Sequence, residues 1–401
     1  AAAHDTEGTI PDTPGVQLGA AVAAAWLRAD QALPAAKLPG VLGIGDTPRD
    51  QRGWRLEHGT LGMGLRLSEQ LGTEFALGWH DRDAAHVEAA WIALRPDAGS
   101  DWSLGGGRGR VPVGPVLDGA GHFDRFAHMP LAKRSAFNGD WIEDGLNLRW
   151  QPHLAGAWSW IERVDLGLWK MDRFPGSSDT PWAPVLHLGA RRDDLALDGF
   201  ATRIRAKRRG AYVQRENSGH THSAPSCDAS LRDISCFDGT VDLAGASLRW
   251  DTPLRGLQLA AAGTVRRERG ALYSFNGDTR YSGRTLGGWL EAVWQPVAHW
   301  ELGLRQEWLK NRASVAGPGA SAVASDANLL PSHPARRTAA MLGWRPSPVW
   351  LLAVEAGRDR TLAILKAEHT RDIGADEGIS LRPAEPGLNG IVHGDLKQAL
   401  L

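Results

Sequence analysis

The chain has 401 residues, so one large domain or two ordinary domains are the expected arrangements. Lys and Arg number 45 against 46 Asp and Glu, and this balance argues against a nucleic-acid binder that depends on bulk positive charge. Two biases need a physical cause. Only seven of the basic residues are lysines, and 18 Trp stand against 8 Phe and 3 Tyr.

The N-terminal region predicts an exported protein without a spanning helix. No stretch reaches the roughly 18 to 20 uninterrupted apolar residues that a transmembrane helix needs. The nearest candidate, residues 19–27, is shorter and is followed by Arg28. The opening Ala1-Ala2-Ala3-His4 resembles what remains after cleavage behind a small-residue signal site. We therefore expect a mature exported protein whose signal peptide has been removed.

Period-2 alternation recurs along the chain in stretches typical of β-strands. Residues 73–80 place Phe and Leu side chains on one face and small or polar side chains on the other. Residues 300–308 and 352–359 follow the same pattern. Each ribbon could be a half-buried strand of a soluble sandwich or a strand of a membrane barrel, and the connections decide between the two.

The predicted strands occur in pairs joined by short turns that are flanked by Trp and Pro. Examples are residues 248–259, 288–305 and 341–354. Successive pairs are separated by much longer polar stretches. Short turns that alternate with long loops are typical of a transmembrane β-barrel, and Trp at strand ends matches the aromatic girdle at the headgroup level. An aromatic girdle would explain why the chain contains so many Trp residues.

The sequence predicts an all-β fold, a transmembrane antiparallel barrel of about sixteen strands with short periplasmic turns and long extracellular loops. Residues 1–14 are expected to form a flexible periplasmic tail and residues 15–401 a single barrel. The predicted strands cover 16–28, 53–67, 72–81, 86–95, 101–110, 144–151, 162–171, 183–191, 194–207, 240–250, 256–268, 284–295, 299–310, 337–345, 349–360 and 391–401. The predicted long connections are 29–52, 111–143, 208–239, 269–283, 311–336 and 361–390.

A barrel of this size encloses an aqueous lumen, so passage of solutes is the default function. No Gly-x-Ser-x-Gly elbow and no His-Glu-x-x-His pair occurs in the sequence. We therefore expect neither an enzyme nor a cofactor. An energy-coupled receptor would need about 22 strands and an N-terminal plug, for which the chain has no room.

A glycine-rich strand end carries a family resemblance. The run from Leu104 to Gly114 reads Leu-Gly-Gly-Gly-Arg-Gly-Arg-Val-Pro-Val-Gly and resembles the strand end of outer-membrane porins related to the phosphate-selective porins O and P. The resemblance implies a sixteen-stranded, commonly trimeric channel with an arginine-lined pore. The stretch from His122 to Gly145 is similar in position to a porin's third, inward-folding loop.

A run of basic residues is the sharpest candidate for a functional site. Arg203, Arg205, Lys207 and Arg209 occupy every second position, with Thr202, Ile204 and Ala206 on the alternate face, so the four cations are expected to project from one side of a strand. On the lumen side they would favour anions, because cations on the lipid face at the bilayer midplane cost roughly 2 to 4 kcal/mol each. The alternative is an upper strand end that meets lipopolysaccharide phosphates.

Two further arginines and a set of acids complete the candidate pore lining. Arg108 and Arg110 either face the pore or mark entry into a loop, because four glycines between residues 105 and 109 leave the register open. Acids at expected inward positions would set a field across the lumen or neutralise the arginines. These acids are Glu74, Glu88, Glu291, Glu301, Glu307 and Glu355.

The only two cysteines lie in one polar segment. Cys227 and Cys236 are expected to form a local disulfide in an oxidising compartment. His220 and His222 lie close by, and His-x-His with thiols could hold zinc or copper. Ordinary loop histidines are the alternative.

Three functional classes fit the sequence. A passive diffusion porin for small, anionic solutes accounts for the strand number, the girdle and the arginines. A barrel that sheathes a periplasmic electron-transfer protein would need a cytochrome partner from outside, because the chain has no Cys-x-x-Cys-His haem site. A structural or adhesive barrel and a metal-linked transporter form the third class. The expected partners are solutes, outer-membrane lipid and lipopolysaccharide, and further copies in a homotrimer, with no nucleic acid.

Overall fold

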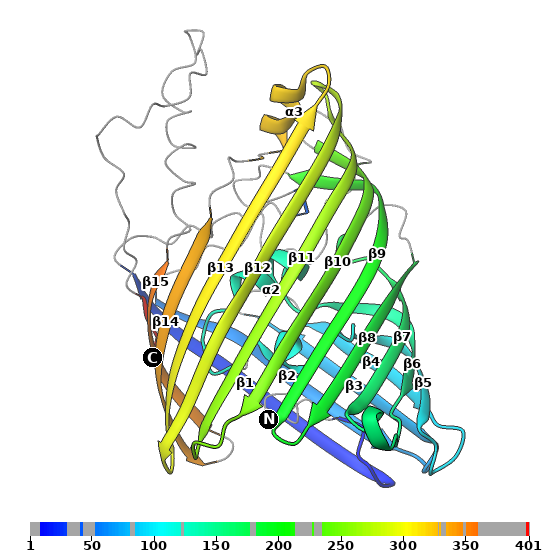
Figure 1. Ribbon diagram of the computed structural model, residues 1–401, viewed down its shortest axis with the longest axis vertical. Coiled ribbons are helices and arrows are strands. Elements are labelled where there is room, and N and C mark those ends of the chain that lie inside the picture. Colours follow the sequence, from blue (N-terminus) through cyan, green and yellow to red (C-terminus); the bar gives the residue numbers. More distant parts are fainter. Residues whose placement is uncertain are drawn as a thin grey trace.

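Sixteen antiparallel strands form one sheet, which confirms the predicted fold class and strand number (Figure 1). The computed structural model describes residues 9–29, 41–42, 53–80, 85–121, 124–176, 182–212, 227, 235–327, 329, 334–347, 350–359 and 398–400. Among these residues no helix is both long and apolar enough to cross a membrane. The strands are β1 (Gly15–Ala29), β2 (Gly53–Arg66), β3 (Leu71–Trp79), β4 (His86–Leu94), β5 (Trp102–Arg110), β6 (Ile142–Trp150), β7 (Ile161–Lys170), β8 (Trp182–Arg192), β9 (Leu195–Tyr212), β10 (Ser235–Asp251), β11 (Leu257–Ser274), β12 (Gly277–Val297), β13 (Trp300–Ala316), β14 (Ala335–Ser347), β15 (Trp350–Asp359) and β16 (Gln398–Leu400).

Sequential strands are neighbours throughout the sheet, as in an up-and-down barrel. The short strand β16 pairs with both β15 and β1 and so closes the strand order. Of the predicted last strand, 391–401, the structure describes these three residues. The described helical elements are α1 (Pro115–Gly119), α2 (Leu131–Phe137), η2 (Gly156–Trp158) and α3 (Ala320–Asp326).

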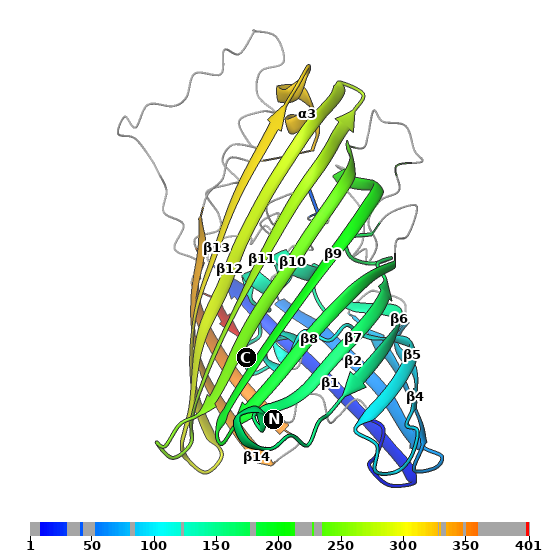
Figure 2. The same ribbon diagram turned by 45° about the vertical axis from the view of Figure 1, so that its right-hand side comes forward.

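The barrel wall is much taller on one side than on the other. Strands β9 to β13 have 17 to 21 residues, whereas β3 to β6 have nine each. Figures 1 and 2 show these long strands rising as a tilted wall above the short ones, with α3 beside the top of β13. The upper part of this wall therefore extends beyond the span that the short strands cover.

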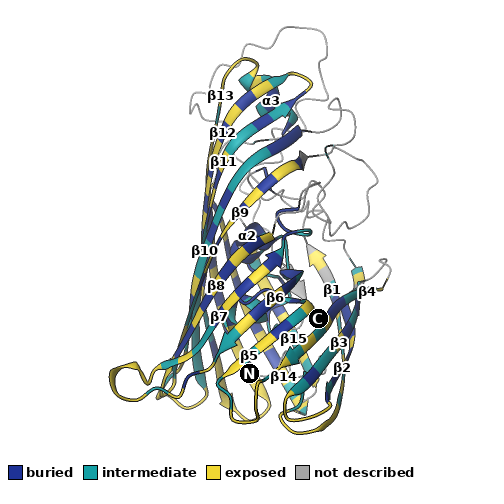
Figure 3. Ribbon diagram, turned by 90° about the vertical axis from the view of Figure 1, so that its right-hand side faces the viewer, coloured by how far each residue is buried: buried dark blue, intermediate teal, exposed yellow. Residues whose placement is uncertain are grey.

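Exposed and buried residues alternate along the strands, as the colours in Figure 3 show. In β12, Leu286 and Leu290 are 44% and 55% exposed, whereas Thr285 and Trp289, which directly precede them, are buried. Leucines exposed in this way are typical of the lipid-facing surface of a membrane barrel.

Tryptophans gather near the short turns, as the sequence predicts. Trp102 and Trp150 are cross-strand partners whose rings stack 5.4 Å apart, and Trp300 faces Trp344 at 6.4 Å. Their position at the strand ends fits an aromatic girdle at one membrane interface.

One predicted connection is wrong. Residues 269–283 were expected to form a long loop, but β11 and β12 continue through them and meet at a two-residue turn, Phe275 and Asn276. Inward Leu272 and Tyr281 keep the alternation going, while polar and basic side chains on the outer face give the stretch the composition of a loop.

Candidate functional site: a segment inserted into the barrel

The chain between β5 and β6, residues 111–141, folds into the barrel. It contains α1 and α2, and α2 packs against β11, β12 and β13, which lie far from β5 and β6 in the strand order. Figures 1 and 3 place α2 on the inner side of the tall wall. Residues 111–141, called here the inserted segment, therefore occupy part of the lumen, as the likeness to a porin's third loop implies.

Carboxylates of the wall hold the backbone of the inserted segment. Glu307 accepts a hydrogen bond from the Leu131 N–H at 2.7 Å, and Glu355 accepts one from the Ala127 N–H at 2.8 Å. Glu301 forms an ion pair with Arg125 of the segment at 3.2 Å. All three glutamates are buried on the inner face, as predicted. Their role is to anchor a segment, which the sequence did not indicate.

Arg305 of β13 is the centre of this anchoring network. Its guanidinium donates to the His128 carbonyl at 3.0 Å and forms ion pairs with Asp124 and with Glu291. The same group lies 4.1 Å from the ring centroid of Phe126. Because Arg305 is buried, its charge is balanced by these partners rather than by water.

The other face of α2 is apolar and packs on the tall wall. Phe137 stacks on Trp141 at 5.1 Å and lies 5.7 Å from Phe200 of β9. A Cβ on Gly287 of β12 would come within 2.9 Å of the Ala132 Cβ, so only glycine permits this approach. A continuous apolar cluster thus fills the space between the segment and strands β9 to β12. Any solute path must run on the opposite side of the inserted segment.

The inner face of β2 to β4 carries a histidine cluster that sequence reasoning missed. His58 Nδ1 lies 3.3 Å from His80 Nδ1, and His58 Nε2 lies 3.3 Å from Glu88 Oε1. His86 Nε2 is 3.6 Å from the same carboxylate oxygen. Across the described residues no group of three or more His, Cys, Asp or Glu side chains has an arrangement that could hold a metal ion. Strand alternation could have indicated His58, because it lies two positions before Thr60 and therefore points to the same, inner face.

A second network that sequence reasoning missed lies on β6 to β9. Asp165 is fully buried and accepts hydrogen bonds from Asn147 at 2.8 Å and from Arg149 at 3.0 Å. His187 contacts Asp165 through Nδ1 at 2.9 Å and Asp198 through Nε2 at 3.1 Å. The network satisfies its own charges and fixes this part of the inner wall.

The register of the tall wall identifies its inner face. Arg266 of β11 donates to the carbonyl of Ser135 in the inserted segment, so Arg266 points inward. Its cross-strand partner is Leu243 of β10, whose partner in β9 is Thr202. Directly opposed residues share a face of the sheet, and Thr202 therefore faces the lumen.

The prediction that Arg203, Arg205 and Lys207 line the lumen is corrected by this register. They alternate with Thr202 and so project from the outer face, where all three are exposed. Arg203 forms an ion pair with Asp242 at 2.5 Å. The three residues thus lie at the upper end of the strand and on the outside of the barrel, as in the second of the two alternatives.

Arg209 faces inward because a bulge shifts the register of β9. The preceding residue, Arg208, has a φ of 52°, and the pairing with β10 is irregular at this point. The Arg209 guanidinium is fully buried and donates to the carbonyls of Pro175 at 2.5 Å and Leu42 at 3.0 Å. Arg209 thus links the β1–β2 and β7–β8 connections to the barrel wall, and its side chain has no exposed surface that a solute could contact.

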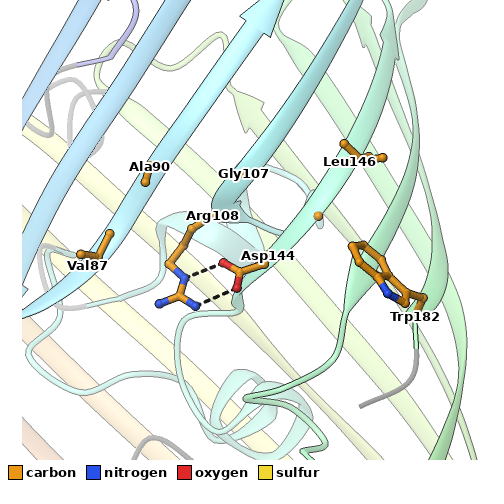
Figure 4. A pocket seen from close by; sticks show the side chains of 8 residues that line it. Val87, Ala90, Gly107, Arg108, Asp144, Leu146 and Trp182 are labelled. Carbon is orange, nitrogen blue, oxygen red and sulfur yellow. Dashed lines mark hydrogen bonds and ion pairs between the residues drawn. The ribbon is translucent and has the colours of Figure 1, made fainter. Parts of the chain in front are cut away.

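The two arginines of the glycine-rich strand end lie in different places. Arg108 lies on the outer face and forms a bidentate ion pair with Asp144, at 2.7 and 2.9 Å, beside an apolar depression of about 560 Å³ that Trp182 lines (Figure 4). Its prediction as a pore-facing residue is therefore corrected. Arg110 ends β5 and reaches Asp118 and Asp140 of the inserted segment, each at 3.4 Å.

The glycines of this strand make room for aromatic rings. A Cβ on Gly105 would collide with the indole of Trp91, and one on Gly145 with the indole of Trp169. These two indoles stack on the inner face with centroids 5.5 Å apart. The run is thus part of strand β5 and not an entry into a loop, and its glycines let the rings lie flat on the backbone.

Cys227 and Cys236 form the predicted disulfide, with their Cα atoms 6.0 Å apart. Cys236 lies at the start of β10, opposite Tyr273 of β11, and is buried. His220 and His222 lie outside the described residues.

Comparison with known proteins supports the fold class. No family model and no curated protein matches the chain. Among solved structures, a loop-deletion mutant of OmpT, an outer membrane protein of Vibrio cholerae, aligns with a TM-score of 0.54 at 10% identity, over 86% of this chain and 93% of that one. In-vitro folded OmpT in its trimer form gives 0.52 at 11% identity, over 87% and 89%. The outer membrane channel DcaP of Acinetobacter baumannii gives 0.53 at 8% identity, over 88% and 93%. The chain therefore has a porin-like outer-membrane barrel fold.

Proposed function

We propose that the chain is a porin-like outer-membrane channel, through which small solutes diffuse passively beside the inserted segment. The observation that carries this proposal is the anchoring of that segment across the lumen by Glu307, Glu355 and Arg305. A sixteen-stranded barrel without such a segment would leave a wide opening, and a fixed segment narrows it to a defined path.

We propose weak rather than strong anion preference. The basic row of β9, on which the expectation of anion selectivity rested, projects outward, and Arg305 in the lumen is balanced by carboxylates. Arg108 of the motif that resembles the phosphate-selective porins is also on the outer face. The remaining solute path is thus lined by both positive and negative groups. We therefore expect the channel to select solutes by size more than by charge.

Planar bilayer recordings test both parts of the proposal. The protein should produce discrete conductance steps, and the triple variant R203Q/R205Q/K207Q should keep the wild-type reversal potential across a salt gradient, because these residues lie outside the path. A folded protein that gives no steps would contradict the channel. A shift of the triple variant toward cation permeability would contradict the outward placement of the row.

We also propose assembly as a homotrimer, which the trimer form of the similar Vibrio cholerae OmpT supports. The exposed apolar side chains Leu61, Met63 and Phe75 on the outer face of β2 and β3 offer a surface for contact between copies. Native mass spectrometry in detergent should give three times the chain mass. A single-chain mass under all mild detergents would contradict this assembly.

A further inference from the structure

The outer face of the tall wall changes from apolar to basic partway along its strands. In β12 the outward residues Leu290 and Leu286 are followed, toward the top of the tall wall, by Arg284 and Arg280. The neighbouring strands change in the same way. We call the exposed outward cations the basic belt, and its members are Arg203, Arg205, Lys207, Arg267, Arg269, Arg280, Arg284, Lys310 and Arg312.

The height of the belt matches the far interface of a membrane. Trp294 of β12 lies at the short-turn end, in the girdle. From Trp294 to Arg284 the strand rises about 34 Å, which at the usual tilt is about 25 Å along the membrane normal. This is the height of the apolar band of an outer-membrane barrel. The belt therefore lies where the headgroups of the outer leaflet begin.

The belt contains an arrangement that is unfavourable without an external anion. Arg267, Arg284 and Arg312 are directly opposed on β11, β12 and β13. Like charges placed opposite each other destabilise a sheet. Asp242 is paired with Arg203 at one end of this row, and among the described residues no carboxylate forms an ion pair with Arg284 or Arg312.

We propose that Arg267, Arg284 and Arg312 bind a phosphate group of the phosphorylated glycolipid in the outer leaflet. Guanidinium groups donate two parallel hydrogen bonds to phosphate, and three of them on adjacent strands surround one anion. Directly below, exposed Leu286, Leu290 and Leu304 supply an apolar surface for the acyl chains. The combination of clustered guanidinium groups above leucines fits a lipid headgroup better than a free anion. Phosphate binding by these three arginines does not depend on conduction through the lumen.

Thermal unfolding in a neutral detergent, with and without bisphosphorylated lipid A, tests the proposal. For the wild type, added lipid A should raise the unfolding midpoint by several degrees, because binding to the folded state stabilises it. The variant R284Q/R312Q should be at least as stable as the wild type without lipid A, because the repulsion is removed, and should lose most of the rise. The control R192Q/R255Q removes two exposed cations near the short turns and should respond like the wild type.

Two further probes separate the sources of the effect. Dephosphorylated lipid A and inorganic phosphate should each give much smaller rises than bisphosphorylated lipid A. The proposal is overturned if lipid A stabilises R284Q/R312Q as much as the wild type, or if it stabilises neither. An equal effect of inorganic phosphate would overturn the assignment to a lipid. The conductance of R284Q/R312Q should equal that of the wild type, so a failed channel and a failed lipid site give different results.

Discussion

At the scale of single residues, Arg305 shows how a charge is kept inside the barrel. Its guanidinium is enclosed by Asp124, Glu291, the His128 carbonyl and the Phe126 ring, which belong to the wall and to the inserted segment. Removal of one member of a buried charge network leaves its partners uncompensated. The network therefore makes the position of the segment depend on one side chain.

Substitution R305Q should lower the free energy of unfolding by about 3 kcal/mol or more, because two carboxylates lose their shared partner. Urea titration of the folded barrel in lipid vesicles measures this loss. R255Q, in the exposed turn between β10 and β11, is the control and should change little. Equal stability of R305Q and R255Q would show that the network contributes nothing.

Gly287 is a second residue on which the segment depends. In G287A the new methyl group would meet Leu309 Cδ1 at 2.8 Å and the Cβ and Cα of Ala132 at 2.9 and 3.1 Å, so α2 must move away from the wall. Overpacking of this kind costs about 1 to 3 kcal/mol. G263A, where a methyl group meets its nearest atom at 3.6 Å, is the matched control. Urea titration should show a loss of stability for G287A and none for G263A. Equal stability of the two variants would contradict the close packing of α2 on β12 at this position.

At the scale of elements, β9 shows what a strand pattern can and cannot predict. Alternation correctly placed Arg203, Arg205 and Lys207 on one face. The choice of face followed the rule of an apolar outer and a polar inner side, which holds where the outer face meets lipid and the inner face meets water. In the upper part of β9 the inner face packs on buried connections and the outer face leaves the lipid, so the rule is reversed.

The sequence predicts where the inserted segment lies in the chain, but it does not predict which wall residues hold the segment. Its position between β5 and β6 followed from the strand list, and the inward glutamates followed from alternation. Which residues of 111–141 those glutamates bind depends on contacts about 170 to 230 residues apart in sequence, such as Ala127 with Glu355. Local periodicity carries no information on such pairs. The histidines on β2 to β4 come together only through register, for the same reason.

Loosening the attachment should alter the conductance. In E307Q/E355Q the backbone N–H groups of Leu131 and Ala127 lose their charged acceptors, so the segment should fluctuate. Single-channel recordings should then show noisier current with a larger mean. E162Q, an exposed glutamate of β7 that pairs with Arg191, serves as the control. Quiet recordings identical to those of the wild type would mean that the two acceptors do not restrain the segment.

At the scale of the whole molecule, the barrel has two different halves. The tall half, β9 to β13, packs its inner face on the inserted segment and carries the basic belt outside. The short half, β2 to β6, presents histidines and carboxylates to the lumen and apolar side chains outside. We therefore propose that solutes pass along the short half and that lipid headgroups bind to the tall half.

We expect the inserted segment to set the size of the solute path. Liposome swelling with neutral sugars of increasing size tests it directly, in the wild type and in a variant whose residues 115–137 are replaced by a short Gly-Ser linker. The wild type should admit only the smaller sugars, and the variant should admit larger ones while it remains a heat-modifiable, β-rich barrel. An unchanged size limit in a correctly folded variant would contradict the claim.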